Sequence, residues 1–306
     1  MSGAGKIAIT GGTGFVGQAV LDAAKRRDLA VRALARRVPD DRPSVEWVHG
    51  NLHDEAALRT LAGGADAVVH IAGLTNTPDI AEFARANVAG TQAMIDAARD
   101  AGTKRFVFVS SLSARKPELS AYGASKLEAE KLVEASGLNW TIVRPPAVYG
   151  PRDSDMFELF KSARLGIVPL PPGGATSLIH VDDLAALLLD LVPSSPIVRR
   201  KLFEPDDGRV GGWSHKELAK EIGRAVGRPV LAPHLPRGVL LGAAKIDRLV
   251  RGDGAKLTAD RVGYMCHPNW VARSDKSVPD SVWSPAIKSE QGLRQTAEWY
   301  RRENWL

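Results

Sequence analysis

A tyrosine and a lysine four residues apart, Tyr122 and Lys126 in the segment YGASK, are the side chains best suited to acid–base chemistry in this sequence. On a helix, residues at this spacing lie on one face, so the phenol and the ammonium would be neighbours. The pKa of a free phenol is about 10, and an adjacent positive charge lowers it by favouring the ionised form. Such a pair can transfer a proton at a carbonyl or alcohol oxygen. Because a single YxxxK is also common on helix surfaces, a second motif is needed.

The second motif is TGGTGFVG at 10–17, in which Gly11, Gly14 and Gly17 follow a short apolar run and open a helix-like stretch. This is the context that a dinucleotide-binding turn requires. The first glycine permits the tight turn, the second lets the backbone approach the pyrophosphate, and the third lets the helix pack close to the strand. The pyrophosphate then lies at the positive end of the helix.

These motifs need a scaffold, and the first half of the chain alternates strand-like and helix-like segments. This alternation predicts an α/β fold, a Rossmann-type doubly wound parallel sheet with helices on its faces. Right-handed crossovers would bring the carboxyl ends of all strands to one edge, where the motifs fall. We expect strands at 6–10, 30–35, 45–49, 67–71, 105–110 and 140–144, and helices at 15–27, 54–62, 79–101 and 121–136.

The pattern weakens after Pro151, where Pro/Gly-rich breaks and short helix-like stretches begin. We predict a dinucleotide-binding Rossmann core over 1–150, to which 176–203 returns. The segments 151–175 and 204–306 would form a small, partly helical C-terminal substrate cap. Five of the seven tryptophans follow residue 210, which suits a cap that buries apolar area. Ordinary packing inside the cap accounts for most of them equally well.

The chain resembles the extended short-chain dehydrogenase/reductase superfamily, whose members include NAD-dependent epimerases and dehydratases. The resemblance rests on ordered segments along most of the chain, which are TGGTGFVG, GNLHD at 50–54, VVHIAG at 68–73, NVAGT at 87–91, FVFVSS at 106–111, YGASK, RPPAVYGP at 144–151 and LIHVDDLA at 178–185. These segments specify the fold more sharply than the reaction.

The resemblance implies a catalytic set of Ser111, Tyr122, Lys126 and Asn87. Tyr122 would be the acid/base, and Lys126 would stabilise its phenolate and hold the nicotinamide ribose. The second serine of VSS, Ser111, would polarise the substrate oxygen, although Ser110 and Ser113 are close neighbours. Asn87 would support the proton path, or be an ordinary helix-surface amide.

Arginines at the end of the second predicted strand indicate which cofactor binds. NAD-preferring folds carry a carboxylate there for the ribose hydroxyls, whereas this chain has Arg36 and Arg37. A guanidinium can pair with a 2′-phosphate, so we predict NADP in preference to NAD. The predicted cofactor site comprises Gly11, Thr13, Gly14, Phe15, Val16, Gly17, Arg36, Arg37, Asn51, Leu52, Ala72, Gly73, Tyr122, Lys126 and Pro145.

Several reactions are open to such a site. Dehydration needs acid/base residues after the catalytic serine, where this chain has Leu112 and Ser113. Nucleotide-sugar enzymes of this superfamily usually carry an asparagine at the position of Ala147. The sequence therefore favours an NAD(P)-dependent oxidoreductase that interconverts a secondary alcohol and a ketone on a bulky, largely apolar small molecule. The alternatives are a nucleotide-sugar epimerase and, in another class, a nucleotide-binding scaffold or sensor without catalysis.

Composition limits the partners. The net charge is +6 over 306 residues, but basic clusters are short and lack interleaved aromatics, so we expect no nucleic-acid partner. No apolar stretch approaches the ~20 residues of a membrane span, and we expect no membrane partner. One cysteine and no signal-like start suit the cytoplasm. His180, Asp182 and Asp183 lack a third ligand with supporting spacing, so we predict no metal.

A homodimer is also expected from the resemblance, in which two helices per subunit pair. Apolar residues on the presumed outer faces of those helices are Phe83, Met94, Leu127 and Leu132. Ordinary packing against the sheet would explain them equally well.

Overall fold

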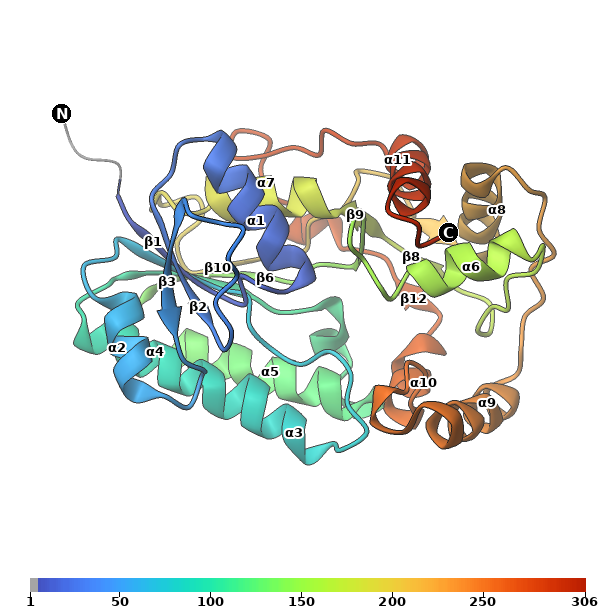
Figure 1. The fold of residues 1–306 in the computed structure, drawn as a ribbon, viewed down its shortest axis with the longest axis horizontal. Helices are drawn as coiled ribbons and strands as arrows, with labels where there is room; N and C mark the ends of the chain where they lie inside the picture. The colour runs from blue at the N-terminus through green and yellow to red at the C-terminus, as the bar shows by residue number, and fades with distance from the viewer. Residues whose placement is uncertain (1–4) are drawn as a thin grey trace.

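A seven-stranded parallel sheet forms the centre of the computed structural model, which describes residues 5–306 (Figure 1). The strand order is β10-β6-β5-β4-β1-β2-β3. The first four residues of the predicted core lie outside the described range. The strands are β1 (Ile7–Thr10), β2 (Val31–Ala35), β3 (Val45–His49), β4 (Ala67–His70), β5 (Arg105–Val109), β6 (Asn139–Val143) and β10 (Lys201–Phe203).

Helices cover both faces of this sheet, as the α/β prediction requires. In Figure 1, α1 and α7 lie above the sheet, and α2, α4 and α5 lie below it. The helices of the core are α1 (Phe15–Arg26), α2 (Glu55–Ala62), α3 (Ala81–Phe83), α4 (Gly90–Asp100), α5 (Ala121–Ala135) and α7 (Val181–Asp190). A π-helical stretch, Ala84–Ala89, joins α3 to α4, so the expected single helix over 79–101 contains a local widening.

The apolar runs of the strands fit burial on both faces. Along β1, Ile7 and Ile9 pack with the α1 and α7 side, whereas Ala8 packs with the α2, α4 and α5 side. Successive side chains of a strand point to opposite faces, and a parallel sheet covered on both faces therefore reads as a continuous apolar run. This is why the sequence showed apolar segments rather than apolar/polar alternation.

The structure corrects the prediction that Phe83 and Met94 lie on the outer faces of their helices. Phe83 is 1% exposed and Met94 is fully buried, so both point into the chain. Met94 packs in the layer between α4 and the sheet, and the Phe83 ring lies 5.7 Å from the Tyr122 ring. Leu127 and Leu132 are half-buried. The spacing of apolar residues indicated a buried helix face. Spacing alone cannot say whether the sheet or a second subunit packs against that face.

The cap has a hydrophobic core of its own, which includes Tyr149, Phe160, Trp213, Leu293 and Tyr300. Two of its helices are longer than the sequence indicated. The elements between and after those of the core are β7 (Ala147–Tyr149), α6 (Phe157–Arg164), β8 (Ala175–Thr176), β9 (Leu178–His180), β11 (Trp213–Ser214), α8 (His215–Val226), α9 (Arg237–Arg251), α10 (Ala259–Met265), β12 (Asn269–Trp270) and α11 (Ser289–Arg302).

The segment around His180 joins core and cap. The Asp183 carboxylate accepts hydrogen bonds from the backbone N–H groups of Ala286 (3.2 Å) and Ile287 (2.9 Å). His180 is buried and ends β9, which pairs with β7. Asp183 thus has a structural use as a hydrogen-bond acceptor for the chain that leads into α11.

A buried ion pair next to the sheet edge leads to a stability prediction. The Glu130 side chain on α5 is 2% exposed and accepts hydrogen bonds from Arg144 and from the Ser110 hydroxyl. In Glu130→Ala the buried Arg144 would keep only its 3.6 Å contact with Glu204, and breaking a buried ion pair typically costs about 3–5 kcal/mol. We expect a corresponding loss in the free energy of unfolding, measured by urea denaturation. The matched control is Glu128→Ala on the same helix, because Glu128 is exposed in its pair with Lys131; it should cost about 1 kcal/mol or less. Equal effects would contradict the analysis.

Candidate active site

The glycine turn after β1 has the geometry that the sequence predicted. Gly11 has a φ of +77°, a backbone angle that residues other than glycine rarely adopt. A Cβ on Gly17 would overlap the Gly11 carbonyl oxygen. The turn and the first turn of α1 are therefore in direct backbone contact.

Gly14 differs, because neither its backbone nor its protein neighbours require a glycine. Its φ is −81°, and a Cβ there would meet only the Gly11 carbonyl oxygen, at 3.3 Å, among nearby protein atoms. Gly14 instead lines a large cavity in front of α1. A missing side chain where the helix N-terminus faces a cavity fits a bound phosphate group. The residues present thus suit the pyrophosphate of a dinucleotide.

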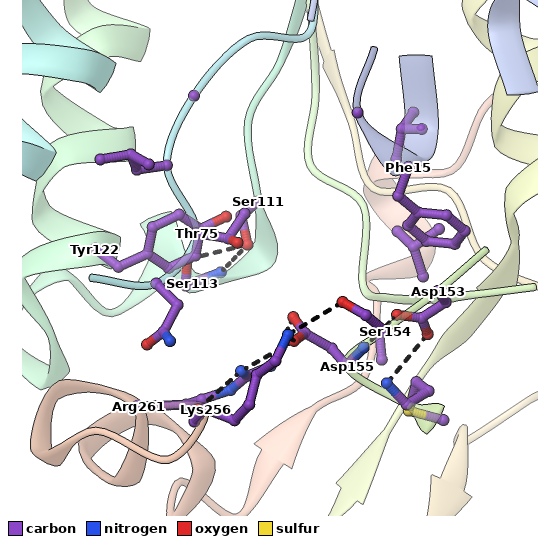
Figure 2. A pocket seen from close by; sticks show the side chains of 18 of the residues that line it. Phe15, Thr75, Ser111, Ser113, Tyr122, Asp153, Ser154, Asp155, Lys256 and Arg261 are labelled. Atoms are coloured by element: carbon purple, nitrogen blue, oxygen red, sulfur yellow. Dashed lines mark hydrogen bonds and ion pairs between the residues drawn. The ribbon is translucent and has the colours of Figure 1, made fainter. Parts of the chain in front are cut away.

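The cavity has a volume of about 1960 Å³ and runs along the carboxyl edge of the sheet into the cap. It brings together residues from many sequence-distant segments of core and cap, and Figure 2 shows Tyr122 and Ser111 on one side with Phe15 on the other. Of the predicted cofactor residues, those that line it are Gly11, Thr13, Gly14, Phe15, Val16, Gly17, Arg36, Asn51, Leu52, Ala72, Gly73, Tyr122, Lys126 and Pro145.

The two arginines after β2 are not equivalent. Both are exposed, but Arg36 lines the cavity and Arg37 does not. Neither forms an ion pair with any residue in the range 5–306. Asn51 lines the same end of the cavity, and its side-chain oxygen accepts a hydrogen bond from the His53 N–H at 2.8 Å.

Tyr122 lies in the first turn of α5, which Ser120 caps by accepting the Gly123 N–H at 2.9 Å. The Tyr122 side chain is 8% exposed. Burial raises its pKa to about 12, and a hydrogen bond with the Ser111 hydroxyl acts against that rise. In the protein alone the phenol therefore stays protonated near neutral pH. In the protein alone, burial thus outweighs the lowering of the pKa that an adjacent positive charge would cause.

Lys126 lies one turn further along α5 and is 4% exposed. Its Nζ donates a hydrogen bond to the Val109 carbonyl oxygen at 2.8 Å and lies 4.8 Å from the centre of the Phe108 ring. Burial lowers the pKa of Lys126 to about 8. The ammonium is thus fixed at the end of β5, beside the cavity.

The three serines after β5 have different surroundings. Ser110 is buried at the cavity wall, and its hydroxyl donates to the Glu130 carboxylate. The Ser111 hydroxyl lines the cavity and accepts hydrogen bonds from the Ser113 N–H (3.2 Å) and the Ser113 hydroxyl (3.0 Å). Ser111 is therefore oriented by its neighbour and faces the Tyr122 phenol (Figure 2).

Asn87 lies behind the cavity wall in the π-helical stretch. Its amide nitrogen donates to the Leu74 carbonyl (3.0 Å) and the Ser125 hydroxyl (2.9 Å), and its oxygen accepts the Leu74 N–H (2.7 Å). Every hydrogen bond that we find for its side chain serves the loop after β4 or helix α5. This geometry favours a positioning role. The alternative prediction, that Asn87 is an ordinary helix-surface amide, is wrong, because the residue is 1% exposed.

Sequence reasoning missed the cap helix that contacts Tyr122. The Asp260 carboxylate accepts the N–H groups of Ala121 (2.6 Å) and Tyr122 (3.3 Å) at the start of α5. A Cβ on Gly263 would overlap the Leu119 carbonyl oxygen, and the Tyr264 ring lies 6.1 Å from the Tyr122 ring. No local pattern in the sequence marks these contacts, because the partners are about 140 residues apart.

A row of polar residues lies across the cavity floor (Figure 2). Arg261 pairs with Asp155 at 2.9 Å, and the Lys256 ammonium lies 3.8 Å from the same carboxylate and 3.2 Å from the Ser154 hydroxyl. Burial raises the pKa of the neighbouring Asp153 to about 7. The two cations are thus mostly neutralised by groups of the protein itself.

Beyond this row the cavity walls are mostly apolar, with Glu158, His215, Asp247, Arg251 and Asp253 among the polar members. Side chains from four cap helices and one strand face it, and of the five cap tryptophans only Trp270 lines it. The other four pack within the chain or lie at its surface. The principal apolar lining residues are Met156, Leu159, Leu218, Ile222, Ala243, Ile246, Val250, Met265 and Trp270.

His70 is buried between two hydroxyl groups and has no access to the cavity. Its ring nitrogens lie 2.7 Å from the Thr10 hydroxyl and 3.1 Å from the Thr91 hydroxyl. Burial lowers the pKa of His70 to about 3, so it is neutral at physiological pH. His70 therefore has a structural role.

Comparisons with known proteins show related sequences along the whole chain. The sequence model described as "NAD dependent epimerase/dehydratase family" matches residues 7–195. Ceramide reductase of Caulobacter vibrioides is 34% identical over 313 residues, covering 99% of this chain and 96% of the relative. UDP-glucose 4-epimerase of Vibrio cholerae is 27% identical over 337 residues, covering 97% and 96%.

Solved structures show the same fold. The structure titled MoeE5 in complex with UDP-glucose and NAD superposes with a TM-score of 0.75 at 22% identity, covering 98% of this chain and 100% of that one. At this level of identity the likeness concerns the arrangement of the elements.

The contact between Asp260 and α5 leads to a prediction about the cap. In Asp260→Asn the charge that accepts two helix N–H groups is lost, and such charge-assisted hydrogen bonds are worth about 1.5–3 kcal/mol. We expect amide hydrogens in α10 to exchange with deuterium roughly tenfold faster or more, measured by mass spectrometry. The control is Asp253→Asn, an exposed carboxylate in the same part of the cap. Unchanged exchange in the Asp260 variant would show that α10 is held without this contact.

Proposed function

We propose, from the premise that this chain belongs to the NAD-dependent epimerase/dehydratase family and is an enzyme of the NAD-dependent oxidoreductase type, that it interconverts a secondary alcohol and a ketone. The substrate is a bulky, largely apolar small molecule. NADP(H) is the preferred cofactor, with NAD(H) as the alternative. Tyr122 serves as the acid/base.

One observation carries the substrate class, namely the apolar wall of the cavity beyond Tyr122. Large pockets bind ligands mainly through apolar side chains with a few placed polar groups. Here helices α6, α8 and α9 contribute Leu159, Ile222 and Ile246 to the same cavity as Tyr122. The relative that matches over 99% of the chain is named for ceramide, a lipid, which agrees with such a cavity.

The pKa of Tyr122 fits the role of an acid toward a ketone oxygen. A phenol with a pKa of about 12 is protonated near neutral pH, so it is ready to donate a proton to a ketone oxygen. The Ser111 hydroxyl, held by Ser113, would polarise the same oxygen. When bound, the nicotinamide would supply the hydride for the carbonyl carbon. Acid and polarising group thus come from two different elements that meet at one point.

Lys126 and Asn87 would position the reaction. The Lys126 ammonium, fixed by the Val109 carbonyl, lies near Gly73, where it can reach a ribose hydroxyl. It also places a positive charge beside the Tyr122 phenolate that forms when the proton leaves. Asn87 ties the loop after β4 to Ser125 on α5, so it holds both walls of this space at a constant separation.

A nucleotide-sugar epimerase is the second candidate. It is supported by the full-length similarity to UDP-glucose 4-epimerase. Against it stands Ala147, which lines the cavity where relatives of that kind usually carry an asparagine, and the cavity cations Arg261 and Lys256 are already paired with Asp155. A scaffold without catalysis is disfavoured by the joint presence of Ser111, Tyr122 and Lys126 in one cavity.

The oligomeric state and the cellular compartment are proposals as well. No helix among the described residues is long and apolar enough to cross a membrane. The single cysteine is free, which suits a reducing compartment such as the cytoplasm.

The homodimer is proposed from the family resemblance. Its interface would contain Leu127 and Leu132 rather than the buried Phe83 and Met94. Sedimentation velocity tests it, and a monomer at micromolar concentration would exclude it.

The proposed chemistry predicts the effect of Tyr122→Phe. Removing a positioned acid/base typically costs about 10²-fold or more in turnover, while the ring that packs against Phe83 remains. We expect ketone-dependent NADPH oxidation to fall by at least ~10²-fold, with NADPH affinity unchanged by fluorescence titration. Near wild-type turnover in this variant would rule out Tyr122 as the acid.

The position of Arg36 predicts how cofactor choice can be changed. In Arg36→Asp a charge-assisted contact worth about 1.5–3 kcal/mol is replaced by repulsion of the 2′-phosphate. We expect the ratio of NADPH to NADH affinity to fall by more than about tenfold. Arg37→Asp is the matched control, since Arg37 is also exposed but does not line the cavity. If Arg37→Asp alone changes the ratio, the neighbouring arginine is the phosphate ligand; equal affinities in the unmutated enzyme would refute the NADP preference.

A further inference from the structure

Helix α9 carries an exposed apolar face that its packing does not use. Val239 is 52% exposed, Ile246 63%, Leu249 85% and Val250 77%. Scattered exposed apolar residues are normal, but a contiguous group marks an interaction surface. On a helix with 3.6 residues per turn, these four positions fall on one side.

The opposite side of α9 accounts for its attachment to the protein. Leu240 and Ala244 are buried against Val262 of α10. The Asp247 carboxylate accepts the N–H groups of Lys256 (2.7 Å) and Leu257 (2.9 Å). The exposed apolar face is therefore not needed to hold the helix in place.

This apolar face is continuous with the cavity. Ala243, Ile246 and Val250 of α9 line the same cavity as Tyr122, whereas Val239 and Leu249 lie outside its lining. Figure 1 shows α9 at the periphery, on the side of the cap remote from the sheet. A hydrocarbon chain could thus follow Ile246 and Val250 from the surface into the cavity, beside the Asp247–Arg251 ion pair of the same helix.

The charge of α9 indicates what the face contacts. The helix carries the cations Arg237, Lys245, Arg248 and Arg251, and its single carboxylate, Asp247, is used internally. Arg251 is paired with Glu158 and Asp247. Within residues 5–306, Arg237 and Lys245 form no ion pair. Of these two, Lys245 lies at the edge of the apolar face on a helix with 3.6 residues per turn. An apolar face with an unpaired cation at its edge is complementary to an anionic lipid surface.

We propose that α9 docks the enzyme on an anionic bilayer surface and opens the cavity toward it, so that an apolar substrate moves from the membrane along α9 to Tyr122. This inference rests on the proposed function for the substrate, but the docking itself does not. A helix of 15 residues is about 22 Å long and would lie in the interface rather than cross it. The inference departs from the sequence expectation of no membrane partner, which considered only spanning segments.

The test is flotation of the full-length protein with vesicles. We expect binding to phosphatidylcholine vesicles that contain roughly a quarter phosphatidylglycerol, weak binding to pure phosphatidylcholine, and release at about 1 M salt. Leu249→Glu should weaken binding at least about tenfold, because it replaces an apolar side chain that would be buried in the bilayer by a carboxylate. Lys245→Glu should weaken it at least about fivefold. Neither residue lines the cavity.

The matched control is Val210→Glu, which places a carboxylate at a fully exposed position on a cap loop away from α9; it should bind vesicles as the wild type does. Absence of vesicle binding by the wild type, or equal binding by the Leu249 variant, would overturn the proposal. So would a dimer that Leu249→Glu converts to monomer in sedimentation velocity, because the face would then be a subunit interface. Vesicle binding without ketone turnover would instead refute the proposed function and leave the docking intact.

Discussion

One buried hydrogen bond, from the Lys126 ammonium to the Val109 carbonyl at 2.8 Å, fixes helix α5 to the end of β5. It requires that α5 cross β5 where the strand ends, and this places Tyr122 opposite Ser111. The same burial that makes the bond strong lowers the pKa of Lys126 to about 8 and raises that of Tyr122 to about 12. Position and protonation state of the pair therefore have a common physical origin.

The cap depends on this helix as well. Asp260 accepts N–H groups at the start of α5, and Gly263 allows α10 to touch the Leu119 backbone. Because α9 packs on α10, the orientation of α5 also sets where the apolar face of α9 lies. The reactive end, the apolar wall and the proposed membrane face are thus connected by direct contacts rather than by a flexible linker.

The core was predictable from the sequence because strong local patterns specify it. The strand expected at 45–49 is observed at Val45–His49, and the helix expected at 121–136 at Ala121–Ala135. Backbone geometry at Gly11 and Gly17 also follows from local chemistry. The cap was not predictable to this depth. Its contacts, such as that between Asp260 and Tyr122, join distant segments, and apolar periodicity could not tell that Phe83 and Met94 face inward.

The reaction class depends on whether the cavity accepts an apolar ketone, and initial rates with NADPH test this most directly. A panel of long-chain, aromatic and alicyclic ketones would be compared with UDP-glucose under identical conditions, by NADPH absorbance and by product analysis. We predict ketone-dependent NADPH oxidation and no conversion of UDP-glucose. Epimerisation of UDP-glucose with no turnover of any ketone would contradict the account and assign the site to nucleotide sugars.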